Sequence, residues 1–442
     1  MTDRHSPLSP AQASALPTAV RGRVWLPGDG GFEKAGQAWN LAIDQQVTAV
    51  VEAEDAADVT SLVRFAAAAG LSIATQPNGH GATGRAAGSI LLRTGRLAEI
   101  EIDAEHRRAR IGAGVSSGAL QRATAEHGLT ALPGSSPVVS VTGVALGGGL
   151  SWFGRAFGWV ADSITAFDVV DAAGQLRQVS ADQDADLFWA LRGGGGDYAI
   201  VTGLELTLQE APAVFGGRIV WAHEHAAAVA HTFAEVTRSA PNELTLWLEL
   251  MNFPGADPMV AIDVTFLGPE LAARELLGVL DALPAPLSDS LAMISVAELG
   301  SITAEPTDPS PGMSRAALLT GFDEQTSTAL LAEPIAPLLG VQIRHLGGAL
   351  GQDSNSPHGP LVEPYGVYLI GSPALAEATA ITDRQQSILD GLPTSGRRPV
   401  TVLAPGESLA DALPADSLER LRRIKRERDP QGVFRANFSV LD

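Results

Sequence analysis

Hydrophobic and polar positions alternate between strand and helix periods through the first half of the chain. Residues 48–54, TAVVEAE, are typical of a strand. Residues 55–70 carry apolar side chains at helical spacing, with Asp55 placed to cap the helix and Gly70 placed to end it. Further strands are predicted at residues 71–76, 89–94, 99–103 and 108–114, a helix at 117–128 and a hairpin at 163–180.

The pattern changes after about residue 210, where glycine becomes less frequent. Residues 217–283 predict a strand, a helix, two strands and a further helix, and residues 365–371 predict one more strand. This order is typical of an antiparallel sheet with helices on one face. Because 442 residues exceed the usual size of one compact core, we expect a two-domain α+β protein.

The domain boundaries follow from these changes in composition. Residues 1–20 are rich in proline, serine and alanine, and we expect them to form a flexible N-terminus. The first domain is expected at 21–210 and the second at 211–414. Residues 415–442, with a basic helix and a DPQG turn, are expected to return to the first domain.

Charge and composition narrow the function. The formal net charge is −20, which disfavours nucleic acid and anionic membrane surfaces as partners. The chain has no cysteine, which removes disulfides, thiolate catalysis and cysteine-ligated metals. Its N-terminus shows no apolar signal-peptide region, and no stretch is long and apolar enough to span a membrane. These features predict a cytoplasmic protein.

Three glycine-rich segments carry the clearest chemical signal. They lie at residues 76–84, 143–149 and 193–196. Backbone N–H groups at such turns can bind an anion without basic side chains, and lysine is nearly absent here. A dinucleotide pyrophosphate suits that description, while ordinary tight turns are the alternative.

Other motifs point elsewhere but are weaker. Residues 112–118, GAGVSSG, lack the third glycine and the later acidic residue of a Rossmann fingerprint. The same stretch contains Gly114-Val-Ser116-Ser-Gly118, which matches a hydrolase nucleophile elbow in spacing but arises easily in an Ala/Gly/Ser-rich chain. His223 and His225 lack the spacing of a zinc-protease helix, so no metal site is expected.

His80 differs from these because glycines flank it on both sides. Gly79 and Gly81 offer no side chain for packing, so a routine core histidine is not expected. An imidazole in such a loop can donate a hydrogen bond to a cofactor or form a covalent bond with it.

Long stretches of the chain resemble one flavoprotein family. The matching segments are Trp39-Asn40, QPNGHGATG (76–84), the loop at 128–164, DLFWALRGGGGDYAIVTGLEL (186–206), RHLGGAL (344–350) and RIKRERDPQGVFRANFSV (423–440). The chain is similar to FAD-linked oxidoreductases of the vanillyl-alcohol oxidase / p-cresol methylhydroxylase (PCMH) superfamily, in the berberine-bridge-enzyme-like branch. The resemblance implies a PCMH-type FAD-binding domain and an antiparallel-sheet substrate domain.

The resemblance also implies how FAD is held. In the family this histidine carries the flavin covalently, which assigns the link to His80. Many members add a second link through a cysteine, but Ser136 stands there, so His80 would be the only link. The implied cofactor-binding residues are Gln76, Pro77, Asn78, Gly79, His80, Gly81, Ala82, Pro133, Ser136, Val141, Thr142, Gly143, Gly147, Gly148, Gly149, Ile200, Val201 and Asn437.

The sequence departs from the family at the catalytic base. Many bacterial relatives carry a Tyr-x-Asn before the C-terminal helix, whereas residues 397–406 here, RRPVTVLAPG, contain neither tyrosine nor acid. Proton abstraction from an alcohol requires a base. The candidates are Tyr365, Tyr368 and Glu249, although each could also be an ordinary strand residue.

Alternation within strands adds candidate substrate contacts. Trp247 and Glu249 are two apart and share a face, while Tyr365 and Tyr368 are three apart and point to opposite faces. The candidate substrate-binding residues are Trp247, His345 and His358.

Together these features predict an FAD-dependent oxidase that acts on a small-molecule natural product in secondary metabolism. O₂ would regenerate the flavin, and the protein would be a monomer or homodimer. Because the usual base is missing, a non-redox cyclase that retains FAD as a structural cofactor is the alternative.

Overall fold

The computed structural model describes residues 8–211 and 213–441, and the first element is a helix. Helix α1 (Pro10–Ala19) begins at Ser9, whose hydroxyl and backbone form a reciprocal capping box with Gln12. Leu16 is fully buried, and Gln12 Nε2 donates to the Ala69 carbonyl. The expected flexible N-terminus is therefore wrong from residue 10 onward, because packing fixes this segment. Residues 1–7 of that prediction lie outside the described residues.

The first domain holds two sheets, each with five strands among the described residues. The first has the order β1 (Arg23–Trp25), β2 (Ala49–Glu52), β4 (Ile90–Arg93), β3 (Ile73–Thr75) and β20 (Phe434–Arg435). Strands β2, β4, β3 and β20 run parallel, and β1 is antiparallel to β2. Because β20 pairs with β3, the C-terminal segment lies in the sheet that leads into the His80 loop.

The second sheet of this domain is antiparallel. Its order is β5 (Ile100–Asp103), β6 (Arg108–Gly112), β10 (Ile200–Thr207), β8 (Ile164–Val170) and β9 (Leu176–Ser180). A short pair joins β7 (Leu129–Thr130) to β11 (Gln209–Glu210). The predicted 163–180 hairpin is β8 and β9.

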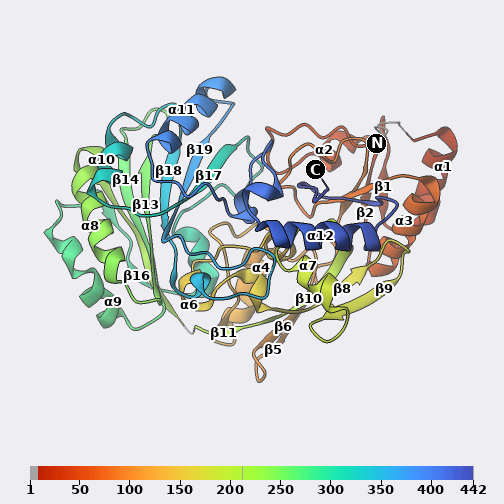
Figure 1. Ribbon diagram of the computed structural model, residues 1–442, viewed down its shortest axis with the longest axis horizontal. Coiled ribbons are helices and arrows are strands. Elements are labelled where there is room, and N and C mark those ends of the chain that lie inside the picture. The colour runs from red at the N-terminus through yellow and green to blue at the C-terminus, as the bar shows by residue number, and fades with distance from the viewer. Residues whose placement is uncertain (1–7, 212, 442) are drawn as a thin grey trace.

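One helix of the first domain, α3 (Ala56–Ala69), begins and ends where the sequence predicts. Asp55 caps α3 by accepting from Asp58 N–H, and Gly70 ends it in the left-handed conformation. The other helices are α2 (Phe32–Gly36), α4 (Ser117–Ala125), α5 (Val141–Leu146), α6 (Gly154–Phe157), α7 (Ala185–Leu191) and α12 (Ala415–Arg428). Figure 1 shows α12 lying along this domain beside α7.

The second domain is one antiparallel sheet. Its order is β15 (Ser288–Asp289), β12 (Val214–Ala222), β14 (Met259–Phe266), β13 (Leu244–Met251), β18 (Gly340–His345), β19 (Tyr365–Gly371) and β17 (Met313–Leu319), with β16 (Ala292–Ile294) also on β12. The helices α8 (Ala226–Ser239), α9 (Glu270–Leu277), α10 (Glu324–Leu331) and α11 (Ala378–Asp390) lie on the side of the sheet away from the first domain (Figure 1).

Alternation along these strands therefore gives the sheet two different faces. One face packs under the helices in a core that includes Leu248, Ile262 and Ile343. The other face is turned toward the first domain, where the Trp247 ring stacks on Trp152 with centroids 3.8 Å apart. The second domain thus presents one strand face to the first domain, and the predicted α+β class with an antiparallel second sheet is confirmed.

Arg155 of α6 holds the two domains together. Its side chain is buried, and Nε donates to the Leu244 carbonyl at 2.9 Å. Nη1 donates to Leu346, and Nη2 to Ala240 at 3.1 Å. One guanidinium thus satisfies carbonyls from separate segments of the second domain. No helix within the described part of the chain is long and apolar enough to cross a membrane.

Candidate active site

The His80 loop follows β3 directly and is held from several sides. Gly79 adopts φ +84°, and a Cβ there would meet Ala38 Cα at 3.0 Å, so only glycine fits without strain. The imidazole stacks on Trp39 with ring centroids 3.8 Å apart. Asn78 accepts Trp39 N–H with its carbonyl and His80 N–H with its side chain. These contacts fix the position of the ring.

The C-terminal segment closes over the same loop. Asn437 Oδ1 accepts from Gln76 Nε2 at 3.4 Å, and the Asn437 carbonyl accepts from Thr83 Oγ1 at 2.9 Å. Asn437 Nδ2 is also the nearest atom, at 4.0 Å, to the Cβ that Gly81 lacks. The fold therefore brings together predicted cofactor residues that lie about 360 positions apart in sequence.

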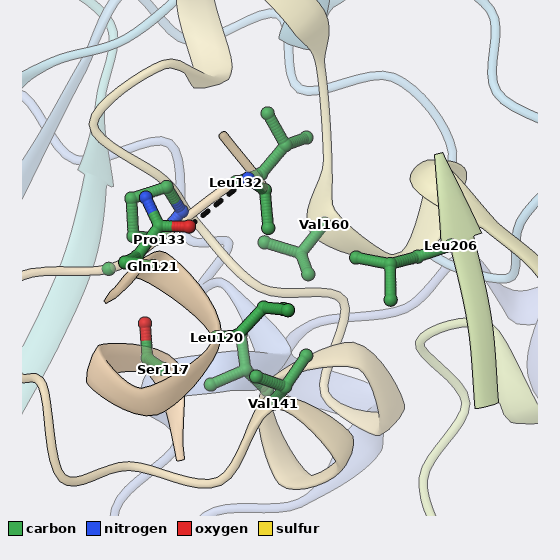
Figure 2. A pocket seen from close by; sticks show the side chains of 11 residues that line it. Ser117, Leu120, Gln121, Leu132, Pro133, Val141, Val160 and Leu206 are labelled. Carbon is green, nitrogen blue, oxygen red and sulfur yellow. Dashed lines mark hydrogen bonds between the residues drawn. The ribbon is translucent and has the colours of Figure 1, made fainter. Parts of the chain in front are cut away.

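The second glycine-rich loop lies against the first. Asn78 Nδ2 donates to the Val138 carbonyl at 2.7 Å. Helix α5 then starts at Ser140, whose Oγ accepts Gly143 N–H. Beneath this loop Pro133 and Val141 line a cavity of about 10 Å³, together with Leu120, Val160 and Leu206 (Figure 2). That space suits a single water rather than a ligand.

Four predicted cofactor residues carry buried polar atoms that have no hydrogen-bond partner among the described residues. They are Gln76 Oε1, His80 Nδ1, Ser136 Oγ and Thr142 Oγ1. Buried polar atoms without partners are rare and costly, so a group of them on adjoining loops indicates a missing polar ligand. At Gly81, apart from Asn437 Nδ2, and at Gly143 a Cβ would meet open space. These residues fit the FAD that the resemblance implies.

The glycines at 147–149 are required by the protein's own packing, and their predicted role in lining the cofactor stays a prediction. Their missing Cβ positions face protein atoms. A Cβ on Gly148 would meet His358 and Trp159 at 3.3–3.4 Å, and one on Gly149 would overlap Val144 at 2.5 Å. Both residues also have positive φ, +89° and +76°. The run therefore serves close packing and an unusual backbone conformation.

His358 lies at this packed junction and not on the substrate-domain sheet. Its ring is tilted against Trp159 with centroids 4.1 Å apart, and it faces Gly148 and Gly193. His358 Nδ1 contacts the Gly359 carbonyl at 2.9 Å, while its buried Nε2 has no partner among the described residues. Burial lowers the pKa of this histidine. It holds the 351–364 segment against the first domain.

The last glycine run leads to a buried ion cluster. Lys425 Nζ donates to the Asp197 carbonyl at 2.6 Å and to Asp429 Oδ2 at 2.8 Å. Asp197 Oδ2 accepts Val440 N–H at 2.9 Å. Asp197 thus fixes the tail that carries Asn437. The predicted cofactor residues Ile200 and Val201 are buried on β10, in the cores on its two faces.

On the second domain, the strand alternation predicted for Trp247 and Glu249 is confirmed. They pair across β13 and β18 with Arg344 and Gln342, on the face turned toward the first domain. Tyr368 also belongs to this face, because it pairs with Gln342 across β18 and β19.

Tyr365 and His345 point the other way. They pair with each other across β19 and β18, and their rings stack with centroids 5.6 Å apart under the helices. The Tyr365 hydroxyl is 2.7 Å from Thr237 Oγ1 of α8, and burial raises the pKa of this tyrosine. Burial and the Arg155 charge lower the pKa of His345 to about 3. Neither side chain suits the predicted catalytic or substrate role, because both lie on the helix-covered face of the sheet, opposite the face that carries Trp247.

Glu249 is part of a buried polar network. Arg218 Nε and Nη2 bind Asp263 at 2.5 and 2.8 Å, and Nη2 also binds Glu249. Gln342 Nε2 donates to Glu249 Oε1 at 3.2 Å. Burial and the neighbouring Glu249 charge raise the pKa of Asp263, against the opposing effect of Arg218. Two carboxylates thus share one guanidinium.

A cavity of about 20 Å³ marks where the sheet meets the first domain. Tyr368 and Arg344 contribute its polar groups, and Leu150 contributes from the second loop. Pro399 and Val402 line the cavity as well. The space admits water rather than a substrate, so the cavity locates the converging side chains and not the whole binding site.

The remaining sequence candidates have structural roles. Ser116 Oγ accepts Ala119 N–H and caps α4, which makes it a helix cap and not a nucleophile elbow. His223 and His225 lie in a one-turn 3-10 helix beside Glu224. Within the described residues no group of His, Asp and Glu could hold a metal ion.

Arg344 was missed at the sequence level, although its motif was visible. In VQIRH (341–345) strand alternation places Arg344 and His345 on opposite faces, and the sequence prediction names His345 as the substrate contact. Knowledge of which face carries the helices was needed to choose between them.

Comparison of the sequence and the structure with known proteins identifies the family of this chain. Residues 47–180 match the family model described as an FAD binding domain. The chain is 30% identical to (R)-6-hydroxynicotine oxidase of Paenarthrobacter nicotinovorans, over 96% of this chain and 98% of that protein. The structure resembles 6-hydroxy-D-nicotine oxidase from Arthrobacter nicotinovorans with a TM-score of 0.85 and 25% identity, covering 96% of this chain and 98% of that one.

A second solved structure has the same fold at lower identity. BBE-like 1 of Physcomitrella patens superposes with a TM-score of 0.85 at 20% identity, covering 97% of this chain and 98% of that one. The chain is therefore an FAD-dependent oxidoreductase that belongs to the vanillyl-alcohol oxidase / p-cresol methylhydroxylase family, in its berberine-bridge-enzyme-like branch.

Proposed function

We propose that this protein is an oxidase that acts on a small-molecule natural product, with Tyr368 as the base and FAD joined covalently to His80 alone. The observation that carries the base assignment is the cavity between the domains. Tyr368 lines this cavity together with Pro399 and Val402, and these two residues belong to the segment in which relatives of this branch carry their tyrosine. Tyr368 thus borders the same space from the second-domain sheet.

The His80 environment supports covalent attachment. Burial lowers the pKa of this imidazole to about 4, so at neutral pH the ring is uncharged and a nitrogen lone pair is available. Nδ1 is buried without a partner in the part of the chain that the structure describes, and Trp39 holds the ring by stacking. Ser136 has no thiol, so a second link of the cysteinyl kind cannot form.

Bound FAD would supply a hydride acceptor that O₂ can reoxidise. The chain has to orient the substrate carbon, exclude water and receive the hydroxyl proton. In its phenolate form Tyr368 can receive that proton at its oxygen. Glu249 is less suited, because Arg218 and Gln342 already occupy both of its carboxylate oxygens.

The test compares two tyrosines of one strand. Tyr368→Phe and Tyr365→Phe each remove one hydroxyl, but the two hydroxyls lie on opposite faces of the sheet. A substrate found by screening secondary alcohols and amines for conversion to any product is mixed anaerobically with each variant. We expect Tyr368→Phe to slow flavin bleaching by about 10²–10⁴-fold, while Tyr365→Phe stays within a few-fold of wild type.

Equal bleaching rates in wild type and both variants would overturn the assignment of Tyr368. Substrate conversion without any bleaching would reject oxidation itself. The non-redox cyclase with structural FAD would then replace it.

A further inference from the structure

Arg344 is the one arginine at the interdomain cavity, and it has no ion pair among the described residues. Its Nε and Nη2 both donate to Gln342 Oε1, at 3.1 and 2.7 Å. Gln342 is a neutral amide, so these hydrogen bonds position the guanidinium without neutralising it. No hydrogen bond to Nη1 occurs among the described residues.

Two aromatic rings fix the guanidinium plane. Arg344 Cζ lies 4.1 Å from the Trp247 ring centroid and 4.9 Å from that of Tyr368. Such contacts attract the cation but supply no counter-charge. Arg344 therefore stands beside the proposed base with its direction set by Gln342 and by the two rings.

The nearby acids cannot serve as its partner in their present arrangement. Glu249 and Asp263 are both bound to Arg218, and Gln342 stands between Glu249 and Arg344. The Coulomb fields of Glu305 and of these two acids reach Arg344, although none of the three bonds to it among the described residues, and burial still lowers its pKa. A half-buried guanidinium without a bonded anion costs free energy, which a bound anion would recover.

We infer that Arg344 binds an anionic group of the substrate, of the carboxylate class, at the interdomain cavity. This inference rests on the proposed function and deepens it. The planar guanidinium matches a carboxylate, and its unused Nη1 provides the donor. The acid would lie against Arg344 and the oxidised carbon toward Tyr368, which lines the same cavity.

The experiment measures binding rather than turnover. The FAD-loaded protein is titrated with 4-hydroxybenzoate and with its methyl ester, and the change in the visible flavin spectrum gives each Kd. In wild type we expect the acid to bind more tightly than the ester. Arg344→Gln should raise the Kd of the acid by about 10–100-fold, because one hydrogen bond to a charged group is lost. The Kd of the ester should change by less than about threefold.

Two further variants complete the design. Arg344→Lys keeps the charge without the planar guanidinium and should retain part of the preference for the acid. This variant also tests the inference if Arg344→Gln does not fold. Arg274→Gln is the matched control, because Arg274 also lies over a ring, Phe215 at 5.3 Å, but on α9, away from the cavity. It should match wild type.

Several results would overturn the inference. One is an equal loss for acid and ester in Arg344→Gln, and another is a wild-type protein that prefers the ester. A third is an unchanged acid affinity together with a lowered flavin midpoint potential, which would assign the charge to the cofactor. Because the titration needs no turnover, an Arg344-dependent acid preference in a protein whose flavin never bleaches would reject the oxidase and leave this inference intact.

Discussion

At the scale of single residues, the cofactor site is defined by side chains that lack partners and by glycines that face open space. His80, Ser136 and Thr142 have buried polar atoms with nothing to bind among the described residues. Gly81 and Gly143 leave room where a side chain would stand. The unpartnered polar atoms and the open glycines lie on adjoining loops, so both indicate the same ligand site.

His80 is the first residue to test. His80→Ala should convert covalently bound FAD into FAD that dissociates on denaturation, because the attaching nitrogen is gone. After acid precipitation the yellow colour should stay in the wild-type pellet and move to the supernatant in the variant. Free FAD from the wild type would contradict the covalent link.

Gly81 and Gly143 test the open side of the site. Gly81→Val and Gly143→Val introduce side chains that meet almost no protein atom, and neither glycine has a positive φ. We expect folded protein whose flavin content, from the ratio of visible to 280 nm absorbance, falls by at least about half. The control is Gly321→Val, which also enters open space but lies in the second domain. Full flavin loading in both site variants would show that these backbones do not approach FAD.

At the scale of elements, one helix turn links the two domains. Arg155 of α6 donates to carbonyls of Ala240, Leu244 and Leu346, all of which belong to the second domain. Burial lowers its pKa to about 10, which still leaves it charged at neutral pH. The link consists of hydrogen bonds to backbone carbonyls, since no carboxylate bonds to this guanidinium among the described residues.

Removal of this link should destabilise the protein strongly. Arg155→Met leaves several buried carbonyls without donors, and we expect a loss of about 2–4 kcal/mol in unfolding free energy. Urea unfolding followed by tryptophan fluorescence measures it. Arg177→Met, at a half-exposed ion pair with Asp171, should cost less than about 1 kcal/mol. Similar losses in the two variants would argue against an interdomain role.

At the scale of the whole molecule, buried titratable groups set opposing pH dependences. His345 has a folded-state pKa of about 3, below its ordinary 6.5. The unfolded state therefore binds more protons between these values, and His345 lowers stability as the pH falls from 6.5 toward 3. Asp263 acts in the opposite direction, because its pKa is raised and the folded state holds the proton longer.

The difference between variant and wild type isolates the histidine. His345→Phe keeps a ring against Tyr365 but cannot titrate, and Asp263 contributes equally to both proteins. Relative to wild type, the variant should gain up to about 1.4 kcal/mol per pH unit below pH 6. Urea midpoints at pH 7, 6, 5 and 4 measure this change. The exposed His231→Gln should show no such trend, and parallel curves for His345→Phe and wild type would refute the assignment.

Local pattern alone determined much of this protein. Capping and stop signals placed α3 between Asp55 and Gly70, and the hairpin at 163–180 followed from alternation. Period-two alternation also placed Trp247 with Glu249 and separated Tyr365 from Tyr368. These features depend on neighbours within a few residues. The FAD-binding fold came instead from the resemblance of long motifs to a known family.

Only the tertiary structure decided which face of the substrate-domain sheet meets the cofactor domain. Alternation separates Arg344 from His345 and Tyr368 from Tyr365, but burial does not tell the two faces apart, because the polar face with Glu249 and Gln342 is buried as well as the apolar one. The helices cover one face and the first domain covers the other, and this choice is made by contacts far apart in sequence. The same long-range packing put His358 against Gly148 and ordered α1 through Leu16. Sequence periodicity determines which side chains of a strand share a face. Which neighbour that face contacts is determined by the elements that pack against the strand.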